Sequence, residues 1–130
     1  MSMDVKARNS YDCGNQLLNN KTYLDQSVHC FYYSLIQLMK YKLANLHSNS
    51  ISYEKQDEDS NGDSSHNWLI NQIYLKFDSR KLGNNFQDVC INLKRLRKKA
   101  DYGSEQITLD ECLNSKDLRD KAVSYLGAIR

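Results

Sequence analysis

Apolar residues recur at steps of three and four along one long segment of the chain, from residue 21 to residue 47. This spacing predicts an amphipathic helix, because side chains three or four residues apart share one helix face. Thr22 followed by Asp25 suggests a capping pair for its first turn. Tyr32 and the flank of Tyr33 widen the apolar face, so we expect this helix to lie centrally in a bundle and to contact several neighbours. The stripe itself consists of Leu24, Val28, Phe31, Leu35, Met39, Leu43 and Leu46.

Weaker or shorter apolar stripes predict further helices. The segment 5–18 is helical in pattern, although Gly14 interrupts it. A third helix carries its stripe over residues 69–77. A fourth carries its stripe over residues 86–100, after a connection over residues 80–85.

A fifth helix is announced by a capping box. Thr108 and Glu111 stand three residues apart, just before an apolar pattern that continues to Ile129. The chain has no proline and five glycines, so it lacks the turn residues of a multi-stranded sheet. We therefore predict an all-α fold, an up-and-down bundle of about five helices in a single domain over residues 1–130.

Residues 49–65 are rich in Ser, Asn, Asp and Glu, and this composition predicts a flexible acidic loop. Within it, Asp57, Asp59, Asn61 and Gly62 match the first half of a calcium loop. The twelfth position of that frame is Trp68, where a bidentate glutamate is required. An acidic solvated turn is therefore favoured over a calcium site.

Length and composition limit the class of protein. A hydrophobic content of 40% and a net charge of +2 exclude a disordered chain and a uniformly basic nucleic-acid coat. No apolar run approaches the roughly 18 residues of a membrane span, and no export signal is seen, so we expect a cytoplasmic protein with reduced cysteines. Cys30, Cys90 and Cys112 stand among apolar residues, as core thiols do, and none of the four cysteines forms a C-x-x-C pair. No metal and no cofactor are predicted.

The most basic part of the chain lies in the predicted fourth helix. Five of the six residues from 94 to 99 are Lys or Arg, and most of them form a solvated face. Arg97 differs, because it falls beside Leu96 at the edge of the apolar stripe. An arginine there needs a carboxylate, a bound anion or another subunit as its partner. A structural ion pair and an anion-binding site are both open on this pattern.

The residues that follow resemble a known family. Arg97 to Tyr102, in the order Arg-Lys-Lys-Ala-Asp-Tyr, resembles the R-x-x-A-D-Y signature in the fourth helix of HEPN-domain proteins, which are small prokaryotic α-helical domains. The segment 23–46, with adjacent Tyr32 and Tyr33, resembles the YYA helix of that family.

Further segments agree in order. Ser65 and His66 with the helix that follows match the family in position, and the capped fifth helix completes the resemblance, which spans about residues 13–126. The resemblance implies a homodimer in which the fourth-helix arginines of both subunits lie in a cleft at the two-fold axis. It also implies a nucleotidyltransferase-type protein partner, because many HEPN proteins are encoded beside one that restrains them.

Many members of the family are ribonuclease toxins or defence nucleases that use an R-x(4–6)-H motif. The fifth, sixth and seventh residues after Arg97 are Tyr102, Gly103 and Ser104, so the histidine of that motif is missing. Attack by a 2′-hydroxyl needs a group that exchanges protons near neutral pH, and a phenol with an ordinary pKa near ~10 is a poor substitute. Binding of RNA without cleavage is therefore favoured.

Three functions are open on the sequence. The preferred one is a nucleotide-, RNA- or partner-binding HEPN module in a toxin–antitoxin or defence system; the alternatives are a metal-independent HEPN ribonuclease and a helical adaptor with no nucleic-acid role. The residues predicted to bind an anion or nucleotide are Arg97, Lys98, Asp101, Tyr102, Tyr32 and Tyr33. The catalytic candidates are Arg97, Tyr102 and His66, and for His66 a capping or core-edge role is favoured.

Overall fold

The computed structural model describes residues 2–61 and 65–130, and all regular structure in these ranges is α-helical. The all-α class is confirmed, with six helices where the sequence predicts about five. No helix in the described ranges is long and apolar enough to cross a membrane. The helices are α1 (Met3–Asn19), α2 (Leu24–Ala44), α3 (Tyr53–Ser60), α4 (Ser65–Tyr74), α5 (Arg80–Tyr102) and α6 (Leu109–Leu126).

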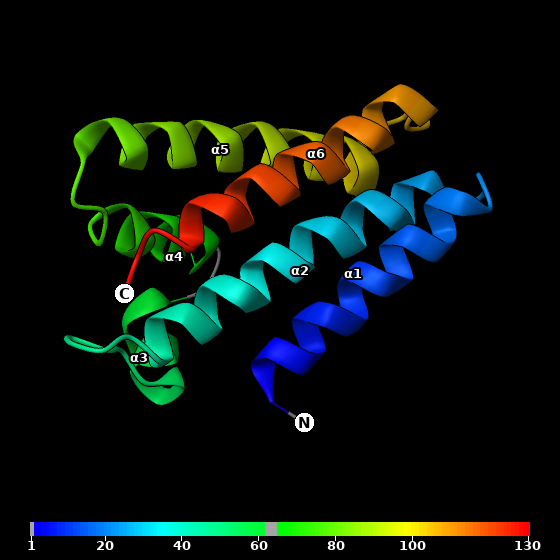
Figure 1. Ribbon diagram of the computed structural model, residues 1–130. Coiled ribbons are helices and arrows are strands. Elements are labelled where there is room, and N and C mark those ends of the chain that lie inside the picture. Colours follow the sequence, from blue (N-terminus) through cyan, green and yellow to red (C-terminus); the bar gives the residue numbers. More distant parts are fainter. Residues whose placement is uncertain (1, 62–64) are drawn as a thin grey trace.

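Helix α2 lies at the centre of the molecule, as predicted. It contacts each of the other five described helices, with α1 along one side and α6 along the other (Figure 1), and it also packs directly on α5. The main core lies between α2, α4, α5 and α6, and a smaller cluster forms near the start of α2 and the end of α1. Phe31, Tyr32 and Met39 are at most 1% exposed. Each such side chain stabilises the fold by about 1.5–3 kcal/mol through its burial.

The start of α2 differs from the prediction. The helix begins at Leu24 rather than Lys21, and Tyr23 precedes it in the left-handed region, with φ of 53°. Thr22 does not cap the helix. Asp25 instead accepts a hydrogen bond from the backbone N–H of Ile107, at 2.9 Å. The carboxylate thus ties the first turn of α2 to the segment that leads into α6.

Gly14 does not interrupt α1, which continues through it to Asn19. A Cβ atom at residue 14 would lie 2.8 Å from Phe31 Cε1, closer than van der Waals contact allows. Ser27 Oγ donates to the Gly14 carbonyl oxygen at 2.7 Å, and both residues are buried. The glycine is therefore required by the close approach of two helices, not by a turn.

The predicted loop over residues 49–65 is wrong in its central part, which forms α3. Ser52 caps this helix by accepting from the Lys55 N–H. Gln56 is 3% exposed, and its Nε2 donates to the carbonyl oxygens of Lys40 and Ile51. A buried amide thus attaches a helix that has no apolar stripe, which is why the hydrophobic pattern missed it.

The half calcium loop is also absent from α3. Asp57 and Asp59 lie on the helix rather than on a ligand loop, and Lys55 Nζ pairs with Asp59 Oδ1 at 3.2 Å. Asn61 follows the helix end, and Gly62 lies outside the described residues. The acidic residues of this segment are explained by a solvated helix face.

The boundaries of the later helices follow local contacts. The predicted connection over residues 80–85 is wrong, because α5 begins at Arg80 and Gly83 is a buried helical residue packed against the Tyr74 ring. Helix α5 ends before Gly103, as predicted. The capping box of Thr108 and Glu111 is confirmed in both of its hydrogen bonds.

The packing at Gly14 gives a testable expectation. Gly14→Ala forces Phe31 to move, and we expect it to lower the free energy of unfolding by about 1–3 kcal/mol in urea titration. Asp12→Ala, at an exposed position of the same helix, is the control and should change it by no more than about 0.5 kcal/mol. Equal effects of the two substitutions would contradict this account of the α1–α2 contact.

Candidate anion-binding site around Arg97

Arg97 lies in the last turns of α5 and points toward α2. Its side chain is 13% exposed, and its Nη2 donates to the Tyr33 hydroxyl at 3.1 Å. Nε lies 2.9 Å from Asp101 Oδ2, one helical turn further along α5. The Nε–H is not directed at that oxygen and has no hydrogen-bond acceptor, so the contact with Asp101 is an ion pair without a hydrogen bond.

Three tyrosine rings surround the guanidinium. Its carbon lies 5.4 Å from the ring centre of Tyr32, 5.6 Å from that of Tyr33 and 5.5 Å from that of Tyr102. Ring faces attract a cation within about 6 Å. Burial lowers the pKa of Arg97, but Tyr33, Asp101 and Tyr102 outweigh burial and raise it overall, so the guanidinium stays charged.

Asp101 is shared between two helices. Besides Arg97, it contacts His29 on α2, whose Nδ1 lies 3.1 Å from Oδ2. The His29 ring also packs against Tyr33, with ring centres 4.5 Å apart. The sequence analysis missed His29; the signal was its position one turn before Tyr33 on the same face of the helix.

His66 lies at the start of α4, half-buried beside the same aromatic group. Its Nδ1 is 3.0 Å from the Tyr32 hydroxyl, and its ring centre is 5.6 Å from that of Tyr33. Burial, together with the positive charges of Arg97, Lys94 and Lys40, lowers the pKa of His66 to about 4. The ring is therefore neutral at pH 7.

Tyr32 completes the link between His66 and Arg97. Its side chain is buried, and burial raises the pKa of the Tyr32 phenol well above the usual value. The phenol keeps its proton at neutral pH. It therefore sits between a neutral imidazole and a charged guanidinium as a fixed dipole, not as a titrating group.

Positive charge is in excess around Arg97. Lys94 Nζ donates to Asn67 Oδ1 at 2.6 Å, and burial together with the charges of Lys98 and Arg97 lowers the pKa of Lys94. Lys98 is exposed on the following turn. The stretch of α5 from Lys94 to Asp101 thus carries five cations and one carboxylate, that of Asp101, and of these cations Lys99 pairs with Glu111 of α6.

Most of the residues predicted for the site lie together. The structure places six of them, Arg97, Asp101, Tyr102, Tyr32, Tyr33 and His66, in one cluster of linked contacts. Lys98 stands at its exposed border. Tyr102 is 76% exposed, so its ring covers Arg97 from the solvent side. The sequence left open whether Arg97 forms a structural ion pair or binds an anion. The structure shows an ion pair with Asp101, and the nearby Lys94 and Lys98 leave the surroundings positively charged.

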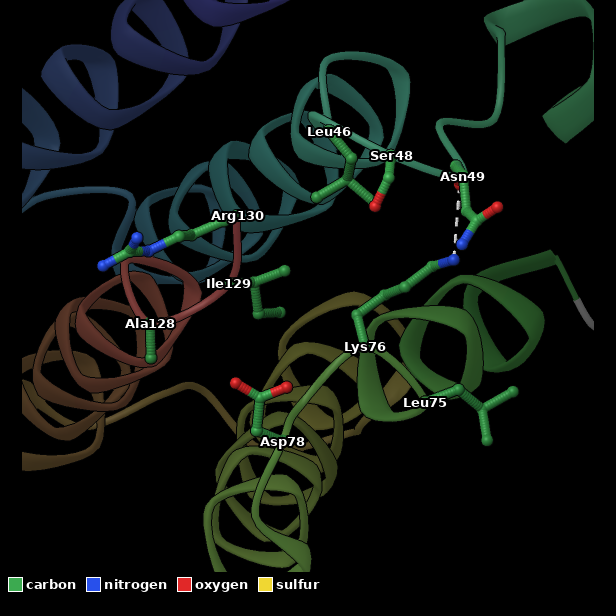
Figure 2. A pocket seen from close by; sticks show the side chains of 9 residues that line it. All are labelled: Leu46, Ser48, Asn49, Leu75, Lys76, Asp78, Ala128, Ile129 and Arg130. Atoms are coloured by element: carbon green, nitrogen blue, oxygen red, sulfur yellow. Dashed lines mark hydrogen bonds between the residues drawn. The ribbon is translucent and has the colours of Figure 1, made fainter.

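Two cavities in the described part of the chain lie near the ends of α2 and α3, and neither is lined by Arg97. Figure 2 shows a cavity of about 370 Å³ at the opposite end of α2, between Leu46, Lys76 and Arg130, where Lys76 Nζ donates to the Asn49 carbonyl oxygen. None of the residues around Arg97 lines this cavity. A smaller cavity of about 110 Å³ reaches His66 from the side of α3. The Arg97 side chain, 13% exposed, meets solvent only beside the exposed ring of Tyr102.

Comparisons with known proteins add no constraint on this assignment. No family model, no curated protein and no solved structure matches the chain.

The low pKa of His66 predicts a pH effect on stability. An unfolded chain binds a proton at His66 near pH 6.5, whereas the folded chain binds it only near pH 4. The stability contributed by the neutral ring is therefore fully present above pH 6.5 and is lost as the pH falls from 6.5 to 4. Because the ring is half-exposed and screened, we expect a loss of about 1–2 kcal/mol.

Urea unfolding at pH 7 and at pH 4.5 measures this loss. His66→Gln should reduce the difference between the two free energies, while His47→Gln, which replaces an exposed histidine, should leave it as in the wild type. A nuclear magnetic resonance titration placing the pKa of His66 near 6.5 would contradict the assigned burial.

Proposed function

We propose that this chain is a HEPN-type domain that binds the phosphate of a nucleotide or an RNA through Arg97. The observation that carries the proposal is the 13% exposed guanidinium of Arg97, which lies among three tyrosine rings, pairs with Asp101 and is close enough to Lys94 to lower, together with burial, the pKa of that lysine. Arginine has five N–H donors in a planar fork that matches phosphate oxygens. The resemblance of residues 97–102 to the family signature supports the same assignment.

The contacts around Arg97 suit reversible binding of an anion. The Nε–H lacks an acceptor, so a phosphate oxygen that replaces Asp101 beside it gains a charge-assisted hydrogen bond. His29 offers Asp101 a second partner at 3.1 Å, which keeps the carboxylate paired when Arg97 turns to the ligand. The exposed ring of Tyr102 provides a face on which a base can stack.

Cleavage of a bound RNA is not favoured by this geometry. With a pKa of about 4, His66 is too weak a base to accept a hydroxyl proton efficiently at neutral pH. Its Nδ1 is also engaged by the Tyr32 hydroxyl. We therefore propose a binding module, for which a nucleotidyltransferase-type protein is the partner that the family resemblance suggests, in a toxin–antitoxin or defence setting.

A homodimer is part of the proposal. One exposed face of α5 combines apolar and basic side chains at helical spacing, namely Ile91, Arg95, Lys98 and Tyr102, of which Ile91 is 47% exposed. Leu93, by contrast, is fully buried in the core of the single chain. Pairing along the Ile91 face brings the basic stretches of two subunits together, and an anion between them offsets their repulsion.

Thermal unfolding tests the anion site. Inorganic phosphate, a nucleoside monophosphate or a short single-stranded RNA should raise the melting temperature of the wild type by several degrees relative to chloride at the same ionic strength, because the ligand binds only the folded state. Arg97→Ala should abolish this rise. Arg8→Ala, which removes an exposed arginine of α1 outside the proposed pairing face, is the control and should retain most of it.

The same samples separate the alternatives. An Arg97→Ala variant that is less stable but keeps the full response to phosphate would show that Arg97 is a structural ion-pair residue. Cleavage of the RNA in the presence of a chelator, lost in Arg97→Ala, would establish a metal-independent ribonuclease instead. No response of the wild type to any of the three probes would leave the helical adaptor as the better account.

Light scattering tests the dimer. We expect a particle of twice the 15.1 kDa chain mass at micromolar concentration. Ile91→Asp should convert it to a monomer with an unchanged helical circular dichroism signal, since the side chain is outside the core. Leu113→Asp, at a similarly exposed position of α6, is the control. A wild type that is monomeric, or dissociation by the control alone, would refute pairing along α5.

A further inference from the structure

Helices α1 and α2 approach each other closely around Gly14. The Gly14 carbonyl oxygen accepts from Ser27 Oγ at 2.7 Å, and the Phe31 ring fills the space where a Cβ of residue 14 would be. Two cysteines flank this contact, Cys13 on α1 and Cys30 on α2. Each of the two helices therefore carries a thiol next to this contact.

The two cysteines lie on the same edge of the helix pair. Further along that edge, Ser10 Oγ contacts Gln37 Oε1 at 2.9 Å. Cys13 follows Ser10 by about one turn of α1, and Cys30 precedes Gln37 by about two turns of α2. Ser27 and Phe31 both contact Gly14, so residue 14 lies level with the turn between residues 27 and 31, and in an antiparallel pair residue 13 then lies level with residue 30. Besides burial, Cys13 contributes to the raised pKa of Cys30, as expected of neighbouring thiols.

The accessibility of this pair differs from that of the other cysteines. Cys13 is exposed and Cys30 is half-buried, whereas Cys90 and Cys112 are at most 1% exposed. Cys112 is also engaged with Ser27 Oγ. A soluble oxidant therefore reaches Cys13 first, and the nearest thiol to it in the described structure is that of Cys30.

We propose that Cys13 and Cys30 form a redox-active dithiol that a peroxide converts to an intramolecular disulfide between α1 and α2. The Cys13 thiolate attacks one oxygen of hydrogen peroxide, the O–O bond breaks, and hydroxide leaves to give a sulfenic acid at Cys13. The Cys30 sulfur then attacks the Cys13 sulfur, its proton goes to the departing hydroxyl, and water leaves. Two thiols are oxidised and one peroxide is reduced to two waters.

The surroundings assign different roles to the two thiols. Burial and the neighbouring Cys13 raise the pKa of Cys30 to about 11, so Cys30 keeps its proton until Cys13 has been oxidised. The exposed Cys13 is then the residue attacked by the oxidant, and Cys30 is the residue that resolves it. This division of roles is typical of reversible disulfides and not of inert core cysteines.

A disulfide at this place has consequences for stability and for α2. It closes a short loop that contains the α1–α2 connection, and such a link stabilises a fold by restricting its unfolded chain. It also joins α1 to the residue next to His29. The inference does not depend on anion binding at Arg97, since it rests on the α1–α2 contact alone.

Peptide mapping of the full chain tests the inference. After treatment with hydrogen peroxide, the intact protein should lose the mass of two hydrogen atoms and remain a single chain. Trypsin cleaves after Lys21, so Cys13 and Cys30 fall in different peptides, 9–21 and 22–40. These peptides should be linked to each other and separate on reduction. The melting temperature should rise by about 5 °C or more in the oxidised protein.

Single substitutions provide the control. Cys30→Ser should leave Cys13 trapped as a sulfenic acid that reacts with dimedone, and Cys13→Ser should leave Cys30 unoxidised. A bond between two copies of Cys13, a bond that includes Cys90 or Cys112, or a peroxide-treated wild type in which Cys13 and Cys30 are both still alkylated would overturn the proposal. Because the decisive measurement uses the wild type, misfolding of a variant does not affect it.

Discussion

Burial of α2 against all five other helices is the constraint on which the remaining structure depends. Most of the surface of α2 is buried, so its neighbours are positioned mainly by the sizes of packed side chains and by single polar or charged groups. Gly14 accommodates Phe31, Gln56 fixes α3 to the end of α2, and Arg97 reaches Tyr33 from α5. Helices α1, α3 and α5 thus each meet α2 through a specific contact in addition to apolar packing.

The Arg97 cluster follows from the same constraint. Because α5 packs on α2 through its apolar stripe, an arginine at the margin of that stripe is placed beside the tyrosines of α2 and shielded from water. Shielding strengthens the electrostatic interactions between the remaining charges, since the effective dielectric constant is lower than in bulk water. The carboxylate of Asp101 contacts both Arg97 and His29, and the Nε–H of Arg97 is left without a hydrogen-bond acceptor.

Hydrophobic periodicity was sufficient to predict the helices that carry an apolar stripe. Arg97 was predicted because spacing along one helix fixes which side chains share an edge. Asp101, Tyr102, Tyr32 and Tyr33 were predicted because the segments that contain them resemble those of HEPN-domain proteins. Gln56 and Gly83 show why the rest was missed: a buried amide supports a polar helix, and a helical glycine is selected by a ring on another segment. His29 was missed because its partner Asp101 is 72 residues away in the chain.

The hydrogen bond from the Ile107 N–H to Asp25 bears on the order in which the chain folds. Helices α1 and α2 are consecutive and meet through local contacts, whereas Asp25 and Ile107 are 82 residues apart. Closing so large a loop costs chain entropy before the contact returns any stability, so the α1–α2 hairpin is expected to form early and the docking of α6 late. Loss of the Asp25 carboxylate would then speed unfolding and leave the rate of folding nearly unchanged.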